Sequence, residues 1–315
     1  MACFHDRISL MKIATFNVEF LFDEGEHKHS GKTWFYSPEY VTGRVDHLAK
    51  VISDVNADFL FLQEVASASM LEKIIKKTDI NYLYFLATPD NRGVGNAVIY
   101  KPTDCKVESI PAVTDFPVMV EGYTDSIGPK LHSRRAFVHL TTVYNGKPLH
   151  LFGLHLNSRF FIHLQSKKDR TPLPIETQME AADGLIRSEI FRSIQARKMR
   201  QVIGEHIAND KNVQIAVMGD FNSKERDTPL RIIQGEFETH DDALFSPARK
   251  ITHEDRYSFV GEHGKKLIDY ILITKNLESS VKSFKILNMG LSYHSNKAPT
   301  PTFIESDHAP IVMEI

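Results

Sequence analysis

Apolar and polar positions along the chain follow two periods, one typical of strands and the other of helices. Short runs rich in Val, Ile, Leu and Phe, bounded by polar or turn-forming residues, predict strands that are buried on both faces. The predicted strands cover residues 12–18, 58–63, 82–87, 96–101, 136–143, 148–156, 213–219, 267–274 and 308–314. Nine strands are enough for two sheets.

Helical spacing appears between these runs. Across 41–55 the apolar residues step by four and three, which predicts one buried helix face. A second helix is expected across 186–208. The stretches 23–40 and 157–185 are predicted to be loops that decorate the scaffold. No Pro/Gly/Ser linker divides the chain, so we expect a single domain over 1–315 with layered α and β elements.

Composition narrows the class of protein. With 42% hydrophobic and 25% charged residues among 315, the chain has the make-up of a soluble globular protein. A formal charge of −2 gives no general attraction for polyanions, which weakens a nucleic-acid substrate without excluding it. Cys3 and Cys105 form no metal motif, and reduced thiols in a cytoplasmic protein are the simpler interpretation.

The N-terminal residues have neither the basic start nor the apolar core of a secretion signal, and no run of about 18 apolar residues occurs. We therefore expect neither secretion nor membrane spanning. Residues 1–10 precede the first predicted strand, and we interpret them as a dispensable extension or a misassigned start.

Two acidic motifs carry the first chemical signal. The predicted strand 213–219 leads into Asp220 and Asn222, which point the same way if the backbone stays extended. A carboxylate and an amide oxygen so placed suit a hard cation such as Mg²⁺, although the same residues also suit a turn with Asx hydrogen bonds. Near the C-terminus, Asp307 and His308 are adjacent, so both can serve one site only at an irregular strand entry.

Asp269 interrupts an apolar strand, where a charge is costly unless it is paired. His308 is the expected partner, because a buried carboxylate fixes the tautomer and orientation of an imidazole. A purely structural ion pair explains Asp269 equally well when it is considered alone.

Other predicted strands end in the same kinds of side chain. Glu64 follows the strand 58–63, Asn17 and Glu19 lie at the end of 12–18, and His155 ends 148–156. Each is explained singly as an ordinary polar group at a strand end. Together, five strand ends carry groups suited to metal or phosphate, which predicts a divalent-metal phosphoryl-transfer site.

These motifs resemble the endonuclease/exonuclease/phosphatase superfamily over nearly the whole chain. The matching segments are Thr-Phe-Asn-Val-Glu at 15–19, Leu-Gln-Glu-Val at 62–65, Leu-His-Leu-Asn-Ser at 154–158, Gly-Asp-Phe-Asn at 219–222, Ile-Asp-Tyr-Ile-Leu at 268–272 and Ser-Asp-His-Ala-Pro at 306–310. The resemblance implies an α/β four-layer sandwich, with two mixed β-sheets packed face to face, helices on the outer faces, and the site at one edge.

The resemblance also implies roles. Glu64 is expected to be the principal Mg²⁺ ligand, with Mn²⁺ as a substitute, and Asn17, Glu19 and Asp307 lie in or beside the metal shell. Asp220 and Asn222 position or deprotonate the attacking water. His308, oriented by Asp269, binds the scissile phosphate, and His155 contacts a phosphate oxygen or assists the leaving group. The choice of base, Asp220 or His308, and of one or two metals stays open.

The family does not fix the substrate. Phosphodiester cleavage in nucleic acid is the first hypothesis, with a phosphomonoesterase or phosphodiesterase acting on a soluble metabolite or a lipid headgroup as the alternative. The backbone contacts proposed for nucleic acid are Arg134, Arg135, Arg159, Lys167 and Lys168. Trp34, Phe35 and Tyr36 either stack on bases or simply pack in their loop. A noncatalytic binding protein is a third hypothesis, and the intact set of site residues argues against it.

Overall fold

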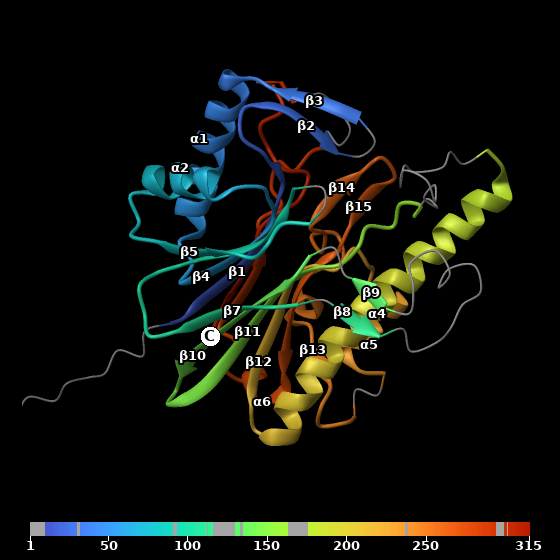
Figure 1. The fold of residues 1–315 in the computed structure, drawn as a ribbon. Coiled ribbons are helices and arrows are strands. Elements are labelled where there is room, and N and C mark those ends of the chain that lie inside the picture. Colours follow the sequence, from blue (N-terminus) through green and yellow to red (C-terminus); the bar gives the residue numbers. More distant parts are fainter. Residues whose placement is uncertain are drawn as a thin grey trace, which may run out of the picture.

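The computed structural model describes residues 10–29, 32–90, 93–111, 113–115, 130–132, 135–162, 176–236, 239–293, 299–300 and 302–315. Two six-stranded mixed sheets pack face to face, with helices on both outer sides (Figure 1). The predicted four-layer α/β sandwich is therefore confirmed.

The first sheet has the order β17-β18-β1-β4-β6-β5. Its strands are β1 (Lys12–Leu21), β4 (Phe59–Val65), β5 (Leu83–Leu86), β6 (Gly95–Tyr100), β17 (Ser283–Ile286) and β18 (Ile311–Glu314). At its centre β1 runs parallel to β4 and antiparallel to β18. The carboxyl ends of β1 and β4 therefore meet at one edge, where the antiparallel strand β18 begins.

The second sheet has the order β13-β16-β12-β11-β10-β7. Its strands are β7 (Lys106–Ile110), β10 (Phe137–Tyr144), β11 (Lys147–His155), β12 (Gln214–Asp220), β13 (Leu244–Phe245) and β16 (Asp269–Thr274). Its centre repeats the first sheet, because β12 runs parallel to β11 and antiparallel to β16.

Small two-stranded ribbons accompany the two sheets. They are β2 (Gly25–His29) with β3 (Lys32–Tyr36), β8 (Val113–Asp115) with β9 (Lys130–His132), and β14 (Phe259–Gly261) with β15 (Gly264–Lys266). Figure 1 shows the β2–β3 and β14–β15 hairpins at the same end of the sandwich.

Helices cover the outer faces of both sheets. Helices α1 (Pro38–Val55) and α2 (Ala68–Thr78) cover the first sheet, and α4 (Gln178–Asn209) and α5 (Thr228–Gln234) cover the second (Figure 1). The short α6 (Lys275–Glu278) follows β16, and a 3₁₀ turn spans Pro247–Lys250. The 32-residue α4 begins with a capping box, in which Thr177 and Glu180 each accept a backbone hydrogen bond of the first turn.

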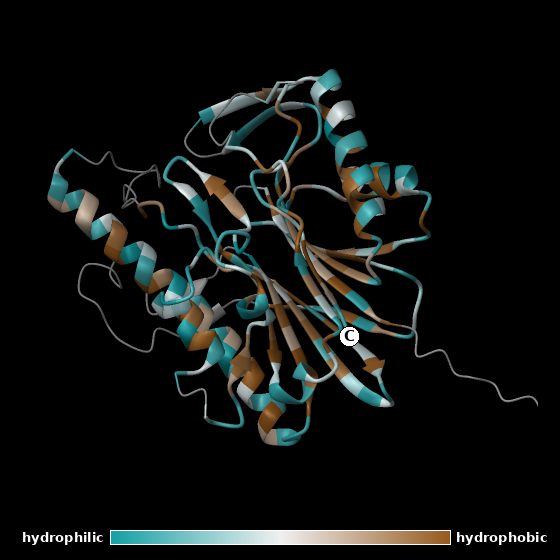
Figure 2. Ribbon diagram, turned by 180° about the vertical axis from the view of Figure 1, so that it is seen from behind, coloured by the Kyte–Doolittle hydropathy of each residue, from teal (hydrophilic) through white to brown (hydrophobic). Residues whose placement is uncertain are grey.

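Strand β4 shows how alternation builds the layers. Phe59 and Phe61 belong to the core shared with the second sheet, whereas Leu60 and Leu62 pack with α1 and α2. The sheets approach closely at Gly153, where a Cβ atom would lie 2.2 Å from Cδ1 of Phe61. Only glycine therefore fits opposite this ring. Figure 2 shows apolar residues concentrated in the strands and on the sheet-facing sides of the helices.

All nine predicted strands are present, with ends displaced by a few residues. The two predicted helices correspond to α1 and α4, and α4 begins eight residues earlier than expected. The loop prediction for 23–40 was wrong, because this stretch forms the β2–β3 hairpin and the start of α1. Helix α2 was not predicted. The edge strands β7 and β17 were also missed, because an edge strand exposes one side and carries polar residues there.

Within the described residues, no helix combines the length and the apolar character needed to cross a membrane. Cys105 carries a free thiol, and Cys3 lies outside the described part of the chain, as do residues 1–9 of the predicted extension.

Candidate active site

Register brings three side chains of the second sheet into one row. His155 at the end of β11 pairs with Asp220 at the end of β12, and Asp220 pairs with Asp269 at the start of β16. Paired residues on neighbouring strands lie on the same face of a sheet. The row therefore follows directly from strand pairing, and all three residues are at most 2% exposed.

The first sheet contributes polar side chains from the ends of β1 and β4 to the same edge of the sandwich. Asn17 on β1 pairs with Gln63 on β4, so Glu64 follows immediately along β4. Beyond Asn17 the ladder is irregular, and both Glu19 (φ 47°) and Glu64 (φ 65°) adopt the left-handed conformation. This conformation costs a non-glycine residue about 1–3 kcal/mol and is concentrated at functional sites.

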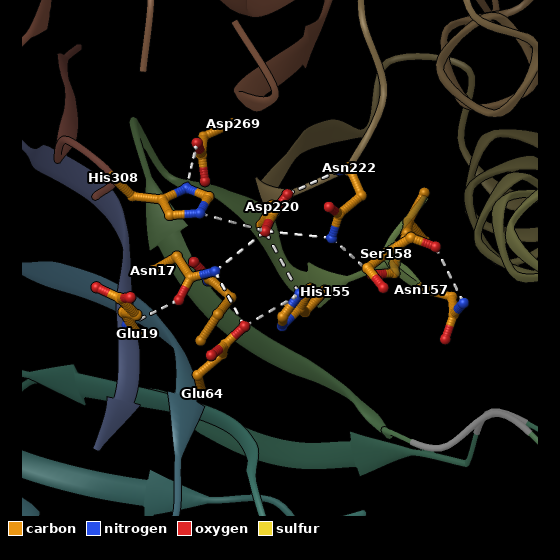
Figure 3. A network of polar contacts seen from close by, with 12 residues as sticks. Asn17, Glu19, Glu64, His155, Asn157, Ser158, Asp220, Asn222, Asp269 and His308 are labelled. Carbon is orange, nitrogen blue, oxygen red and sulfur yellow. Dashed lines mark hydrogen bonds and ion pairs between the residues drawn. The ribbon is translucent and has the colours of Figure 1, made fainter. Parts of the chain in front are cut away.

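Asp220 lies at the centre of a polar network (Figure 3). Its Oδ2 accepts a 3.0 Å hydrogen bond from Asn17 Nδ2, across the two sheets. The same oxygen lies 3.4 Å from His155 Nε2 and 3.9 Å from His308 Nε2. Its Oδ1 accepts a 2.7 Å hydrogen bond from the backbone N–H of Asn222. One buried carboxylate thus joins groups from four segments: β1, β11, the end of β12 and the stretch before β18.

Oxygen ligands gather on the first-sheet side of this network. Glu64 Oε2 accepts a 3.0 Å hydrogen bond from the backbone N–H of Phe20, and its Oε1 lies 3.8 Å from His155 Nε2. Glu19 Oε2 accepts from the backbone N–H of Asp307 at 3.2 Å. Carboxylate and amide oxygens are the donors that a hard cation such as Mg²⁺ prefers. Glu64 and Glu19 thus have the residue type expected of the predicted metal site. Among the described residues, the acidic group whose possible ligand atoms all lie within 4.8 Å of one another is Asp220, Asp269 and His308.

His308 and Asp269 make the predicted contact. His308 Nδ1 donates to Asp269 Oδ2 at 2.8 Å, and both residues are buried. His308 lies in an irregular segment before β18 and forms an isolated bridge with Phe259 of β14. This irregular entry lets the neighbouring Asp307 lie beside it, with Asp307 Oδ1 3.7 Å from His308 Nε2.

The charges of these groups are coupled. Burial raises the pKa of Asp220 to about 7, and the negative charge of Asp269 adds to the effect, whereas His308 and the hydrogen bonds from Asn222 and Asn17 oppose it. Burial alone would lower the pKa of His308. The charge and hydrogen bond of Asp269 and the charges of Asp220 and Asp307 outweigh burial, and the pKa of His308 is raised well above its usual value.

Two serines support the site, one within the 306–310 motif and one outside all the motifs. Ser258 Oγ donates to Asp269 Oδ2 at 2.7 Å and accepts from the Asp269 backbone N–H at 3.0 Å. Ser306 Oγ donates to the backbone oxygen of Asn17 at 2.7 Å and accepts from the His308 backbone N–H at 3.1 Å. Ser306 is the first residue of the 306–310 motif, although its contact with His308 was not predicted. Ser258 has no local signal, because its partner is eleven residues away.

Asp220 and Asn222 at the end of β12 form the Asx turn that was one of the two predictions for this motif, and they also belong to the polar network. The Asp220–Asn222 hydrogen bond is an Asx turn, and Asn222 has φ 48°. Asn222 nevertheless stays in the network, because its Nδ2 lies 3.3 Å from Asp220 Oδ2 and donates to the backbone oxygen of Leu156 at 3.1 Å. The turn therefore orients the amide instead of removing it from the site.

The predicted cationic contacts divide into three cases. Arg134, Lys167 and Lys168 lie outside the described residues. Arg135 is buried and paired with Asp90 at 3.2 Å, which is the arrangement of a structural ion pair. Arg159 is partly exposed and paired with Asp227.

A cationic cluster lies beside the three strand ends of the second sheet. The pKa of Lys266 is lowered by burial first, and then by the positive charges of Lys224 and Arg159. Arg159 follows His155, Lys224 follows Asn222, and Lys266 precedes Asp269 in the sequence. Lys224 and Lys266 also line a hollow of about 650 Å³ whose lining includes Arg256 and Lys265 and also the acidic Glu225 and Glu254, with Arg256 3.5 Å from Glu225. Sequence reasoning missed all of these except Arg159.

The aromatic residues of the β2–β3 hairpin differ in exposure. Tyr36 is buried in the core and Trp34 is partly buried against it, whereas Phe35 is 61% exposed. Of the three side chains, Phe35 has the exposure needed to stack on a base.

Comparisons with known proteins identify the family of the chain and the solved structures that share its fold. The family model described as "Endonuclease/Exonuclease/phosphatase family" matches residues 14–308. The structure of truncated Caenorhabditis elegans TDP2 is similar with a TM-score of 0.58 and 17% identity, covering 97% of both chains. D. rerio TDP2 complexed with single strand DNA product gives 0.55 and 14%, covering 97% of this chain and 98% of that one.

The human Nocturnin catalytic domain with bound sulfate anion gives a TM-score of 0.53 at 14% identity, covering 97% of this chain and 93% of that one. At such identities the similarity to solved structures shows a shared fold. A comparison with curated proteins finds no match.

Proposed function

Because the chain belongs to the endonuclease/exonuclease/phosphatase family, whose members are metal-dependent phosphoric-ester hydrolases, we propose that it hydrolyses phosphodiester bonds of nucleic acid with Mg²⁺. The observation that carries the proposal is the convergence of Asn17, His155 and His308 on Asp220 Oδ2, with Glu64 beside them. In-line hydrolysis of a phosphoester needs a water-orienting base, cationic donors and a metal ligand, and this network contains each type.

Glu64 is the principal metal ligand in this proposal, with Asn17, Glu19 and Asp307 beside it, and Mn²⁺ is expected to substitute for Mg²⁺. The support is the pair of carboxylates at the ends of β4 and β1, where Glu64 and Glu19 are each held by a backbone N–H, together with the adjoining Asp307. When bound, the cation supplies positive charge that offsets the charge of the phosphate oxygens.

Asp220 acts on the attacking water. Its Oδ1 is fixed by the Asn222 backbone, and its Oδ2 is held by Asn17 in the space between the two imidazoles. A carboxylate fixed in this way accepts the proton of the water and keeps the lone pair of the water oxygen directed at phosphorus. Asn222 orients the water through its side-chain amide.

The two histidines act on the phosphate. His308 is oriented by Asp269, which accepts a hydrogen bond from Nδ1–H. The Nε2–H group of His308 is then directed toward the centre of the network. A cationic imidazole in this position stabilises the charge that develops on a non-bridging oxygen. His155 Nε2 lies between Glu64 and Asp220, where it contacts phosphate or protonates the leaving oxygen.

Nucleic acid is the proposed substrate because the cationic cluster of Arg159, Lys224 and Lys266 borders the catalytic strand ends. Phosphate contacts of this kind position a strand without reading its sequence. Lys265 Nζ lies 4.2 Å from the centre of the Tyr257 ring, which holds this cation at the adjoining hollow. The D. rerio TDP2 structure with single strand DNA product gives further support from a fold relative.

The test compares substrates under one set of conditions. The full chain is incubated with Mg²⁺ and an end-labelled single-stranded oligonucleotide, and in parallel with bis(4-nitrophenyl) phosphate, 4-nitrophenyl phosphate, phosphoinositide vesicles and sugar phosphates. We expect cleavage of the oligonucleotide that stops with EDTA and falls by at least about a hundredfold in Asp220→Asn. The matched control is Asp241→Asn, an exposed aspartate outside the site.

Release of inorganic phosphate from monoesters, with an intact oligonucleotide, would support the phosphomonoesterase alternative. Cleavage confined to lipid headgroups or metabolites would support the other alternative. Binding of the oligonucleotide without turnover of any substrate would favour a noncatalytic binding protein.

A further inference from the structure

Three histidines cluster on the outer face of the second sheet. In the β10–β11 pairing, His139 lies opposite Phe152, and Thr141 lies opposite His150, so these four side chains share one face. His206, in the last turn of α4, packs on the same face. Its ring centroid is 4.2 Å from that of His150 and 5.5 Å from that of His139.

The orientation of His139 is fixed by a carboxylate. Its Nδ1 lies 3.0 Å from Glu108 Oε1 on β7, and its Nε2 lies 3.0 Å from His150 Nδ1. Since a carboxylate accepts, His139 Nδ1 carries a proton, and the Nε2 lone pair of the neutral ring points into the cluster. A carboxylate that holds the far nitrogen of an imidazole is the usual support of a metal-binding histidine.

Burial of the three rings favours their neutral form. Burial is the main cause that lowers the pKa of all three histidines, and it lowers the pKa of His150 to about 4. The positive charge of His206 lowers the pKa of the other two further. Neutral imidazole is the form that binds a metal ion, so burial acts in the direction that favours binding.

We propose that His139, His150 and His206 form a binding site for a divalent transition-metal ion of the Zn²⁺ class, with Glu108 as the residue that orients His139. The ligand atoms of the three histidines all lie within 4.8 Å of one another. Tetrahedral Zn²⁺ with bonds of about 2.0–2.1 Å holds its nitrogens about 3.4 Å apart. The His139–His150 pair already has nearly this spacing, and His206 approaches it by side-chain rotation.

The site is separate from the catalytic network in both place and chemistry. His150 precedes His155 by five residues on β11, a distance of about 16 Å along a strand. Imidazole nitrogens select Zn²⁺, Cu²⁺ or Ni²⁺, whereas the oxygens around Glu64 suit Mg²⁺. The ion would join β10, β11 and the end of α4, so its binding is expected to stabilise the protein without changing turnover.

The test is Zn²⁺ binding measured by competition with a chromophoric chelator, on the full chain in excess Mg²⁺ so that the carboxylate site is occupied. We expect one tight Zn²⁺ per chain, lost in His150→Gln and in His206→Gln, and unchanged in Glu64→Gln. Glu108→Gln should weaken binding by about 10–100-fold, as loss of an orienting partner does. The matched control is His263→Gln, an exposed histidine in the β14–β15 turn.

Two further readouts separate binding from folding defects. Co²⁺ should give the intense visible absorption of a four-coordinate nitrogen site, and Zn²⁺ should displace it. Zn²⁺ should raise the melting temperature of the wild type and of Glu64→Gln, but not of His206→Gln. The proposal is overturned by the absence of tight Zn²⁺ binding, by binding that persists in both histidine variants, or by binding that disappears in Glu64→Gln.

Discussion

The ends of β1 and β12 use the same backbone device in two different sheets. At β1, Asn17 Oδ1 accepts a hydrogen bond from the backbone N–H of Glu19, whose φ is 47°. At β12, Asp220 Oδ1 accepts from the backbone N–H of Asn222, whose φ is 48°. A 3.0 Å hydrogen bond from Asn17 to Asp220 joins the two turns.

The neighbouring strands extend this correspondence. Beside β1, the parallel strand β4 carries Glu64; beside β12, the parallel strand β11 ends in His155. On the other side, His308 precedes the antiparallel strand β18, and Asp269 begins the antiparallel strand β16. His308 and Asp269 form a 2.8 Å hydrogen bond to each other across the two sheets.

The difference between the two ends is chemical. The first sheet presents the carboxylates of Glu19 and Glu64 beside the amide of Asn17, with the imidazole of His308 before β18. The second sheet presents the buried acids Asp220 and Asp269 beside the imidazole of His155. Similar strand geometry therefore supports two roles, and the side chain at each equivalent position decides which one. Changes that exchange these side chains test this division directly.

The largest effect is expected from Asp220→Asn, which gives the second sheet the amide found in the first. In the proposed mechanism Asp220 accepts the proton of the water, so kcat should fall by about 10²–10⁴-fold without its carboxylate. Steady-state cleavage of a labelled oligonucleotide measures this loss, with Asp241→Asn as the control. A loss of less than about tenfold would remove Asp220 from the role of base.

Glu64→Gln removes the proposed main metal ligand of the first sheet. Because a neutral amide binds a cation more weakly, we expect the Mg²⁺ concentration for half-maximal activity to rise by at least about tenfold, with partial recovery at high Mg²⁺. A Mg²⁺ titration of activity measures the change. Glu278→Gln, at an exposed glutamate of α6, is the control. An unchanged Mg²⁺ dependence would assign the metal to other residues.

Ser258→Ala tests how Asp269 is held. The variant loses a hydrogen bond to a buried carboxylate, which costs about 1.5–3 kcal/mol of stability. A looser Asp269 orients His308 less well, so turnover should fall by up to about tenfold. Urea unfolding and kcat are compared with Ser279→Ala, at an exposed serine. Wild-type values for both would show that Ser258 only fills space.

Asn17→Asp makes the two turn residues both acidic. Loss of the donor leaves two buried carboxylates opposed and should cost about 1–3 kcal/mol in metal-free urea unfolding. Adding Asp220→Asn restores one donor and one acceptor, so the double variant should regain stability while remaining inactive. Recovery of turnover in the double variant would mean that the two positions are interchangeable.

The smallest effect concerns pH and the outer face of the second sheet. The pKa of His150 is lowered by burial from 6.5 to about 4, so the unfolded chain binds a proton there that the folded chain does not. Stability is therefore complete above about pH 6.5 and declines as the pH falls toward 4. In metal-free urea unfolding at pH 7 and pH 5, His150→Gln should show a smaller decline than the wild type. An equal decline would exclude a contribution from this ring.

Sequence reasoning identified the strands and the polar residues at their ends, because a carboxylate or imidazole after an apolar run is a local signal. Asp269 was also readable, since a charge inside an apolar strand requires a partner. Residues whose role depends on distant contacts were not accessible. Arg135 looked like a substrate contact until the fold paired it with Asp90, and Lys266 looked like any other surface lysine.

The row His155–Asp220–Asp269 has a consequence for how this protein can change over evolution. A one-residue insertion or deletion in β12 would turn Asp220 to the opposite face, because side chains alternate along a strand. Gly219 adds a second constraint, since a Cβ atom there would lie 1.9 Å from the Leu154 backbone oxygen. Insertions and deletions within β11, β12 and β16 are therefore not tolerated, and changes in substrate specificity are expected in the hairpins around these strands.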